Sequence, residues 1–192
     1  MADSAASIEA QAKEYLAEGE YSIDKVSTVP DVTDSKLTFG NKAVKLDATV
    51  LYIDMRGSTK VLEKHHKYTV AKIQKAYLHI VTAIVNNNLG DVRSFNGDGI
   101  LAFFGGANTI MLNWAVLAAM QITWMLTNQC NTYFDKYHSV DFGIGIDYGE
   151  LLVTKVGIGR DHNNNDLSWI GMPVNTAVRL GDSANSPFHI RI

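Results

Sequence analysis

The sequence predicts an α+β fold of the ferredoxin-like, split βαβ kind, a mostly antiparallel sheet with helices packed on one face. Two observations predict it. Segments with strand periodicity and segments with helix periodicity follow one another in the order β-α-β-β-α-β-β-α. The 192 residues include 46% apolar and 19% charged residues, a balance typical of a globular chain that can bury a core.

The first part of the chain precedes the expected core. Residues 5–19 are rich in Ala, Glu and Lys, which predicts a short surface helix. Residues 20–45 are mixed in character and contain a proline and several Asp, Ser and Gly, which favours a loop-rich lead-in. No repeat and no strong linker interrupts the rest. We therefore expect an N-terminal helix and lead-in over residues 1–45 and one domain over residues 46–192.

The first half of this domain predicts a strand, a helix and a hairpin. The apolar, β-branched stretch at residues 48–53 is typical of a buried strand. Apolar residues spaced by three and four predict a helix over 70–84, and the polar segment Asn86–Gly90 ends it. Residues 91–104 are two short apolar strands around Asn-Gly-Asp-Gly. They predict a β-hairpin with Asp98 at its tip.

The second half predicts the remaining elements. An apolar stretch over residues 110–125 has helical spacing and predicts a second long helix. Residues 140–157 predict two further strands with a turn near Tyr148–Gly149. Residues 166–182 predict the end of a strand, a turn and a third helix.

Charge and cysteine content narrow the class of protein. The net charge of −3 argues against a general nucleic-acid binder, because such proteins present a basic face to phosphates. The single cysteine, Cys130, cannot form an internal disulfide, which suits a reducing compartment. The N-terminus lacks the pattern of a signal peptide, and no apolar stretch approaches membrane-spanning length. We expect a soluble, cytoplasmic protein.

Two carboxylates stand at the ends of predicted strands. Asp54 follows a buried strand and precedes a turn that opens a helix, where the N–H groups of Gly57, Ser58 and Thr59 are suited to binding a phosphate. Taken alone, Asp54 is better explained as a cap of that helix, and Asp98 is at home in a hairpin turn without a function. Together, on neighbouring strands, they have the arrangement that binds paired divalent cations for phosphoryl transfer.

A third feature lies in the last predicted helix. Asn175 and Arg179 are four residues apart, so they point the same way from a helix. An amide one turn from a guanidinium suits binding of a sugar and a phosphate. The alternative is a surface arginine with a capping asparagine, which Pro173 near the helix start supports.

Together these segments resemble the catalytic domain of class III nucleotide cyclases, from about Ala48 to Arg191. The resemblance rests on four motifs in the family's order and spacing. They are Asp-Met-Arg-Gly-Ser-Thr at 54–59, the Gly-Asp hairpin and apolar strand at 97–104, the glycine-spaced stretch 145–157, and Gly-Met-Pro-Val-Asn-Thr-Ala-Val-Arg-Leu at 171–180.

The resemblance implies a mechanism and an assembly. Asp54, Asp98 and the backbone carbonyl of Met55 would bind two Mg²⁺ or Mn²⁺ ions per site. Asn175 would hold the ribose, and Arg179 would stabilise charge on the α-phosphate. In this family the metal-binding residues of one chain meet the Asn and Arg of another, which implies a homodimer with two equivalent sites.

The base-reading positions depart from the familiar members. Adenylate cyclases carry Lys where this chain has Ser94 and Asp or Thr where it has Ser168, and the Glu and Cys of guanylate cyclases are absent. Asn96 shares a strand face with Ser94 and is a third candidate to contact the base.

The runs around Asp54 and Asp98 resemble the stand-alone bacterial pyrimidine cyclases of the Pycsar anti-phage system. That resemblance implies cyclisation of UTP, favoured over CTP, to a second messenger that activates a separate effector. Because Ser168 is close to the Thr of many bacterial adenylate cyclases, ATP stays an alternative, as does a catalytically silent nucleotide-binding homologue. A polymerase or diguanylate cyclase would need signature runs that this sequence lacks.

The last residues also depart from the family. The chain stops at Phe188–Ile192, where members continue with further strand and a phosphate-binding lysine. We expect either a truncated sequence or a different residue for the outer phosphates.

Overall fold

The computed structural model describes residues 4–17, 19–106, 109–134, 136, 139–159 and 162–192. The chain forms two compact units, and two long strands, β2 and β5, run through both. The smaller unit contains residues up to Val26, Pro30–Lys45 and Leu152–Trp169. The larger contains Ser27–Val29, Leu46–Leu151 and Ile170–Ile192.

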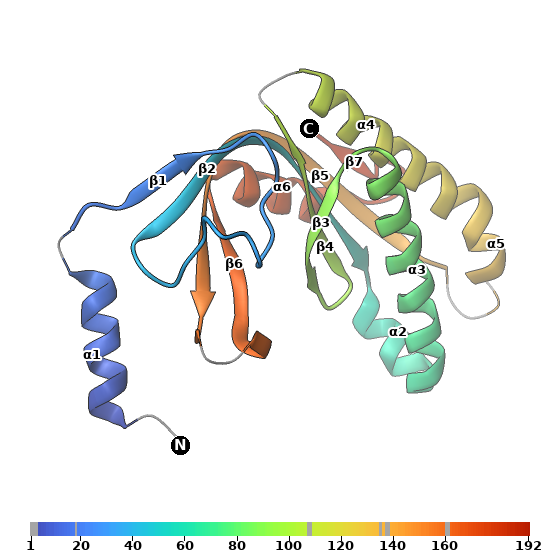
Figure 1. Cartoon of the computed structure of the whole chain (residues 1–192). Helices are drawn as coiled ribbons and strands as arrows, with labels where there is room; N and C mark the ends of the chain where they lie inside the picture. Colours follow the sequence, from blue (N-terminus) through green and yellow to red (C-terminus); the bar gives the residue numbers. More distant parts are fainter. Residues whose placement is uncertain (1–3, 18, 107–108, 135, 137–138, 160–161) are drawn as a thin grey trace. The chain divides into compact units, whose positions relative to one another are not determined.

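The larger unit is built on an antiparallel sheet in the order β3-β4-β2-β5 (Figure 1). The hairpin pairs β3 with β4, and β4 pairs antiparallel with β2. A short β7 adds to β5 in parallel. The strands are β2 (Lys42–Arg56), β3 (Asp91–Asn96), β4 (Gly99–Gly105), β5 (Asp141–Gly157) and β7 (Ile190–Arg191). The predicted α+β fold with a mostly antiparallel sheet is confirmed.

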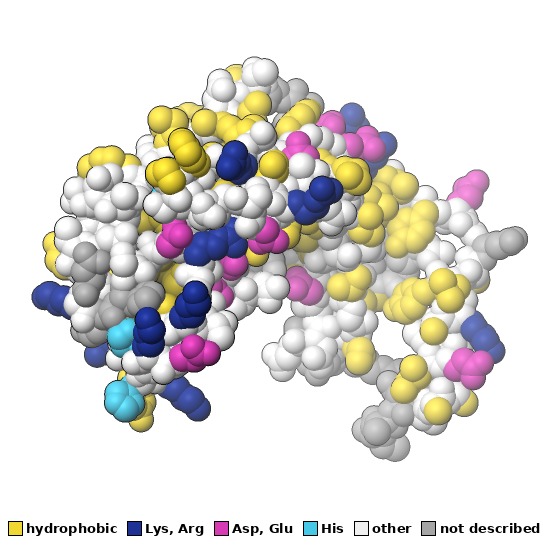
Figure 2. Space-filling view, turned by 180° about the vertical axis from the view of Figure 1, so that it is seen from behind, with side chains coloured by type: hydrophobic (Ala, Val, Ile, Leu, Met, Phe, Trp, Pro, Cys, Tyr) yellow, Lys and Arg dark blue, Asp and Glu magenta, His cyan; other side chains and the backbone are white. Residues whose placement is uncertain are grey.

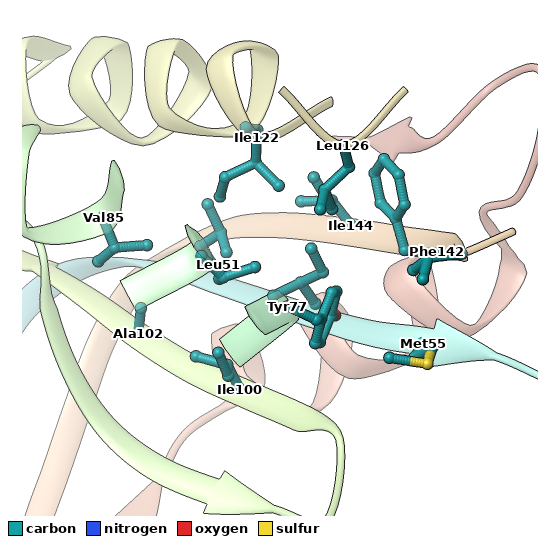
Figure 3. Close-up of a cluster of buried hydrophobic side chains, with 14 of the residues drawn as sticks. Leu51, Met55, Tyr77, Val85, Ile100, Ala102, Ile122, Leu126, Phe142 and Ile144 are labelled. Carbon is teal, nitrogen blue, oxygen red and sulfur yellow. The ribbon is translucent and has the colours of Figure 1, made fainter. Parts of the chain in front are cut away.

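Two long helices, α3 (Lys67–Asn87) and α4 (Thr109–Trp124), cover one face of this sheet (Figure 1). Both bury apolar side chains at helical spacing against strand residues that alternate along β2, β4 and β5. Figure 3 shows this core. A short helix of seven residues, α2 (Ser58–Lys64), links β2 to α3. Helix α4 continues through a π-helical stretch, Met125–Cys130, into α5 (Asn131–Phe134).

The last helix, α6 (Met172–Ser183), packs on the opposite face of the sheet. Two glycines of β5 allow this close approach, because a Cβ on Gly145 would clash with the Ala177 carbonyl oxygen and one on Gly143 would clash with that of Gly181. The neighbouring Phe142, Ile144 and Ile146 point into the core with α3 and α4. The expectation that all helices share one face was therefore wrong for α6.

This close approach gives a stability prediction. Gly145→Ala would place a methyl group into the α6 backbone, and we expect it to lower the free energy of unfolding by about 3 kcal/mol. Gly40→Ala is the control, because the nearest atom to its Cβ position is 3.9 Å away. Urea denaturation of both variants tests this, and equal stabilities would contradict the packing described for α6.

The segment 140–157 also differs from the prediction. It forms one strand, β5, without a turn near Tyr148–Gly149. A Cβ at position 149 would lie 2.8 Å from Cγ of Pro173, so this glycine permits helix packing rather than chain reversal.

The apolar helix α4 corrects a third expectation, that no apolar stretch approaches membrane-spanning length. The continuous helical stretch Thr109–Phe134 is long and apolar enough to span a membrane. Its inner side, with Ala115, Ala119 and Ile122, is part of the protein core. Its outer side leaves Met120 and Trp124 exposed, and Figure 2 shows hydrophobic side chains gathered on the surface over this part.

The smaller unit consists of α1 (Ala5–Leu16), β1 (Ser22–Lys25), residues of β2 and β5, and β6 (Asn165–Ile170) preceded by a turn of 3₁₀ helix, His162–Asn164. β1 pairs in parallel with the start of β2, and β6 lies next to β5. Lys155 donates to the Val32 carbonyl at 2.8 Å and lies over the Phe39 ring. The predicted surface helix is present, and the predicted lead-in contains β1 and the first residues of β2.

Candidate active site

The sheet brings Asp54 and Asp98 to the same edge. Ile53 of β2 pairs with Ile100 of β4, so the next residue, Asp54, lies opposite the base of the hairpin turn. A Cβ added to Gly99 would lie 3.2 Å from Oδ1 of Asp54. Asp98 directly precedes that glycine in the turn. The two carboxylates are neighbours, as their places on adjacent strands predict.

Burial and mutual repulsion act on this pair. The pKa of Asp54 is raised to about 6, first by burial and then by the charge of Asp98. Asp182 raises it further, while Arg56 and the N–H of Met55 lower it. Oδ2 of Asp98 is buried and has no hydrogen-bond partner among the described residues. The site therefore concentrates negative charge, and the positive charge of Arg56 compensates it only in part.

These donors fit a hard divalent cation. Carboxylate oxygens are the ligands that Mg²⁺ and Mn²⁺ prefer, and a buried unpaired carboxylate oxygen is costly unless a cation or donor meets it. Within the described part of the chain, no group of three His, Cys, Asp or Glu side chains forms a complete cage. The remaining ligands must come from backbone carbonyls, water or a phosphate substrate, which is how Mg²⁺ is bound in nucleotide-processing sites.

Arg56 is the cation beside Asp54. Its Nε donates to the Ala184 carbonyl at 3.1 Å and its Nη2 donates to the Gly181 carbonyl, so it binds the C-terminal end of α6. Nη1 lies 3.9 Å from Oδ2 of Asp54 and 3.8 Å from Oδ1 of Asp182. The planar guanidinium thus joins the end of β2 to the end of α6, where cations are favoured.

We expect Arg56→Lys to lower the free energy of unfolding by about 2 kcal/mol, because an ammonium cannot donate to both carbonyls in the fixed geometry of a guanidinium. Arg191→Lys, at an exposed position of β7, is the control. Thermal and urea denaturation measure both. Full stability of Arg56→Lys would mean that the positive charge, and not the geometry of the guanidinium, stabilises this contact.

Two of the three predicted base-reading residues line one small pocket. Ser94 and Asn96 of β3 face a cavity of about 150 Å³ together with Tyr52, Gly99, Leu101 and Val178. A bulge between Val92 and Ser94 shifts the register of the hairpin before these residues. The third candidate, Ser168, lies half-buried on β6 in the smaller unit.

Asn175 and Arg179, the α6 pair, project from the helix away from the sheet. Pro173, Ala177 and Gly181 form the buried side of α6, while Asn175 and Arg179 are exposed and one turn apart. Exposed polar groups at this spacing are available to a molecule that approaches from outside the chain.

The predicted phosphate-binding loop directly follows β2, three residues after Asp54. Gly57 has a left-handed backbone conformation, with φ of 70°, and is the N-cap of α2. Ser58 and Thr59 form the first turn of that helix. Asp54 lies within β2 rather than at the N-cap, so its role as a helix cap is excluded.

Sequence reasoning missed Tyr52, Arg56 and Tyr77. Tyr52 and Arg56 stand two residues before and after Asp54, so the period of two along a strand places all three on one face. This strand periodicity could have identified Tyr52 and Arg56 from the sequence. The pKa of Tyr52 is raised to about 12, by burial and then by Asp54. Tyr77 carries no comparable signal, because its helical spacing is that of any core residue.

The chain was compared with known proteins by sequence and by structure. No family model matches the chain. It is 34% identical over 167 residues to a protein of Xanthomonas perforans named uridylate cyclase, covering 84% of this chain and 70% of that one. A Burkholderia cepacia protein of the same name is 31% identical over 180 residues, covering 90% and 75%. The solved adenylyl cyclase CyaB from P. aeruginosa has the same fold, with a TM-score of 0.66 at 22% identity and 74% of each chain covered.

Proposed function

The chain belongs to the uridylate cyclases, a family of class III nucleotide cyclases, and we propose that it converts UTP to 3′,5′-cyclic UMP and pyrophosphate. The observation that carries this proposal is the Asp54–Asp98 pair, placed at one sheet edge in a chain whose relatives bear that enzyme's name. We favour UTP over CTP as the substrate.

In the proposed mechanism Asp54 and Asp98 bind two Mg²⁺ or Mn²⁺ ions, with help from the backbone carbonyl of Met55. Bound there, the ions would lower the pKa of the substrate 3′-hydroxyl and neutralise charge on the phosphates. The strand and hairpin contribute rigidity. Asp54 lies on a paired strand, and Asp98 lies in the tight two-residue turn between the paired residues Asn96 and Gly99, so neither carboxylate depends on a long loop for its position.

Asn175 and Arg179 act on the other parts of the nucleotide. Asn175 holds the ribose so that its 3′-oxygen is in line with the bond from the α-phosphorus to the leaving pyrophosphate. Arg179 donates to the α-phosphate, where charge develops as the new P–O bond forms and the old one breaks. The N–H groups of Gly57, Ser58 and Thr59 bind the outer phosphates.

We propose that the active unit is a homodimer in which each site combines Asp54 and Asp98 of one chain with Asn175 and Arg179 of the other. Exposure of the α6 pair supports this arrangement, since both side chains are free to meet a nucleotide held by a second chain. Two-fold symmetry then gives two equivalent sites.

Ser94 and Asn96 contact the base in this proposal, and Ser168, on β6 of the smaller unit, is kept as the third candidate for a base contact. The pocket that the first two line measures about 150 Å³, which favours a small base edge. A hydroxyl and an amide also match the mixed donors and acceptors of a pyrimidine. We place the catalytic domain at residues 46–192, although residues 152–169 within it belong to the smaller compact unit.

We place the reaction in the cytoplasm of a bacterium. There cyclic UMP would act as a second messenger for a separate effector in defence against phage.

The test is a substrate panel. The purified chain is incubated with Mn²⁺ and UTP, CTP, ATP or GTP in separate reactions, and the products are resolved by mass spectrometry. Cyclic UMP as the main product supports the proposal. Cyclic AMP alone would identify an adenylate cyclase, and no cyclic product from any substrate would indicate a silent homologue.

A further inference from the structure

Two buried polar atoms near the site lack partners. Within the described residues, the Tyr77 hydroxyl and Oδ2 of Asp98 are both shielded from solvent and make no hydrogen bond. One is a donor and the other an acceptor. A buried polar group without a partner is destabilising, so folded proteins rarely keep one without a reason.

The Tyr77 side chain shares the protein core with residues that flank both carboxylates. It is fully buried on α3, in the cluster that contains Ile53 and Met55, the two neighbours of Asp54, and Ile100, two residues after Asp98. Figure 3 shows its ring among these core side chains, with Met55 and Ile100 labelled. The charges of Asp54 and Asp98 both act on its hydroxyl, in addition to burial.

A phenylalanine would fill the same space in the core without an unpaired oxygen. A tyrosine whose hydroxyl lies near a carboxylate is instead suited to orient that carboxylate. Groups that hydrogen-bond to metal-binding carboxylates typically change metal affinity by 10- to 100-fold when removed.

We propose that Tyr77 is a positioning residue that donates a hydrogen bond to Oδ2 of Asp98 and orients this carboxylate for a divalent cation. The proposal rests on the proposed function, because it assigns Asp98 to the metal. Both groups belong to the larger unit, with Tyr77 on α3 and Asp98 in the β3–β4 turn. The hydrogen bond would leave the other oxygen of Asp98 free to bind the cation.

The experiment measures Mn²⁺ binding to the nucleotide-free protein by isothermal titration calorimetry. We expect Tyr77→Phe to raise the Kd about tenfold. Thr49→Val is the matched control. It also removes a buried hydroxyl without a partner, but one that lies five residues before Asp54, about 16 Å along the strand. We expect its Kd to stay within about twofold of the wild-type value.

Asp98→Ala separates a failure of the Tyr77 proposal from a failure of the proposed metal site. If it abolishes Mn²⁺ binding while Tyr77→Phe binds like the wild type, the Tyr77 proposal fails and the metal site stands. If the wild-type chain binds no Mn²⁺, both fail. As a second measurement, Asp98→Asn is combined with Tyr77→Phe. A combined loss smaller than the sum of the single losses supports one shared contact, and additive losses contradict it.

Discussion

Asp98→Ala is expected to abolish turnover, lowering kcat by about a thousandfold or more while the protein remains folded and dimeric. The reason is that Asp98 and Asp54 are the acidic side chains that the sheet brings together at this edge. Losing one of two carboxylates removes charge stabilisation worth several kcal/mol in the transition state. Cyclic nucleotide production at saturating Mn²⁺ measures the loss.

The fold should tolerate this change for an electrostatic reason. The charge of Asp98 raises the pKa of Asp54, so removing it relieves repulsion between two partly buried carboxylates. Circular dichroism and light scattering check folding and the dimer. Asp24→Ala, at an exposed position of β1, is the control and should keep full activity. A monomeric or unfolded Asp98→Ala chain would mean that this residue is structural.

The parts of the fold that follow from local patterns were predicted well. The helix over 70–84 is α3, and the hairpin with Asp98 in its turn is β3–β4. In both cases the information is local, because a helical period of apolar residues or a turn dipeptide between two apolar strands depends on neighbours in the sequence. The convergence of Asp54 and Asp98 follows from the pairing of adjacent strands.

The parts that depend on distant residues were not predictable from such patterns. The glycines of β5 resembled a turn signal, but they serve the packing of α6, which begins more than twenty residues later. The period of two along β2 places Arg56 on the face of Asp54, but no spacing rule connects it to the carbonyls of Gly181 and Ala184 that it binds. A side chain whose partner is remote in sequence has no periodic signature.

Arg179→Ala is the second variant with a large expected effect. We expect kcat to fall about a hundredfold or more, because a positioned donor to developing phosphate charge is typically worth that much. KM should change less, since the contact strengthens as charge develops. Arg179 is exposed on α6, so the substitution leaves the packing of the helix intact.

Mixing inactive chains tests where Arg179 acts. If each site takes its carboxylates from one chain and Arg179 from the other, a dimer of one Asp98→Ala chain and one Arg179→Ala chain has one complete site. In an equal mixture that exchanges freely, about half of the dimers are mixed, so activity should recover to about a quarter of the wild-type level.

The control mixture combines Asp98→Ala with Asp54→Ala. Both chains lack the same half of the site, so no pairing completes one and no activity should return. Recovery in the first mixture and not in the second would assign the carboxylates and Arg179 to opposite chains. Failure of the first mixture to recover, with chain exchange verified by mass spectrometry, would instead require Asp98 and Arg179 to act within one chain. The exposed position of Arg179 on α6 would then need an explanation other than a shared site.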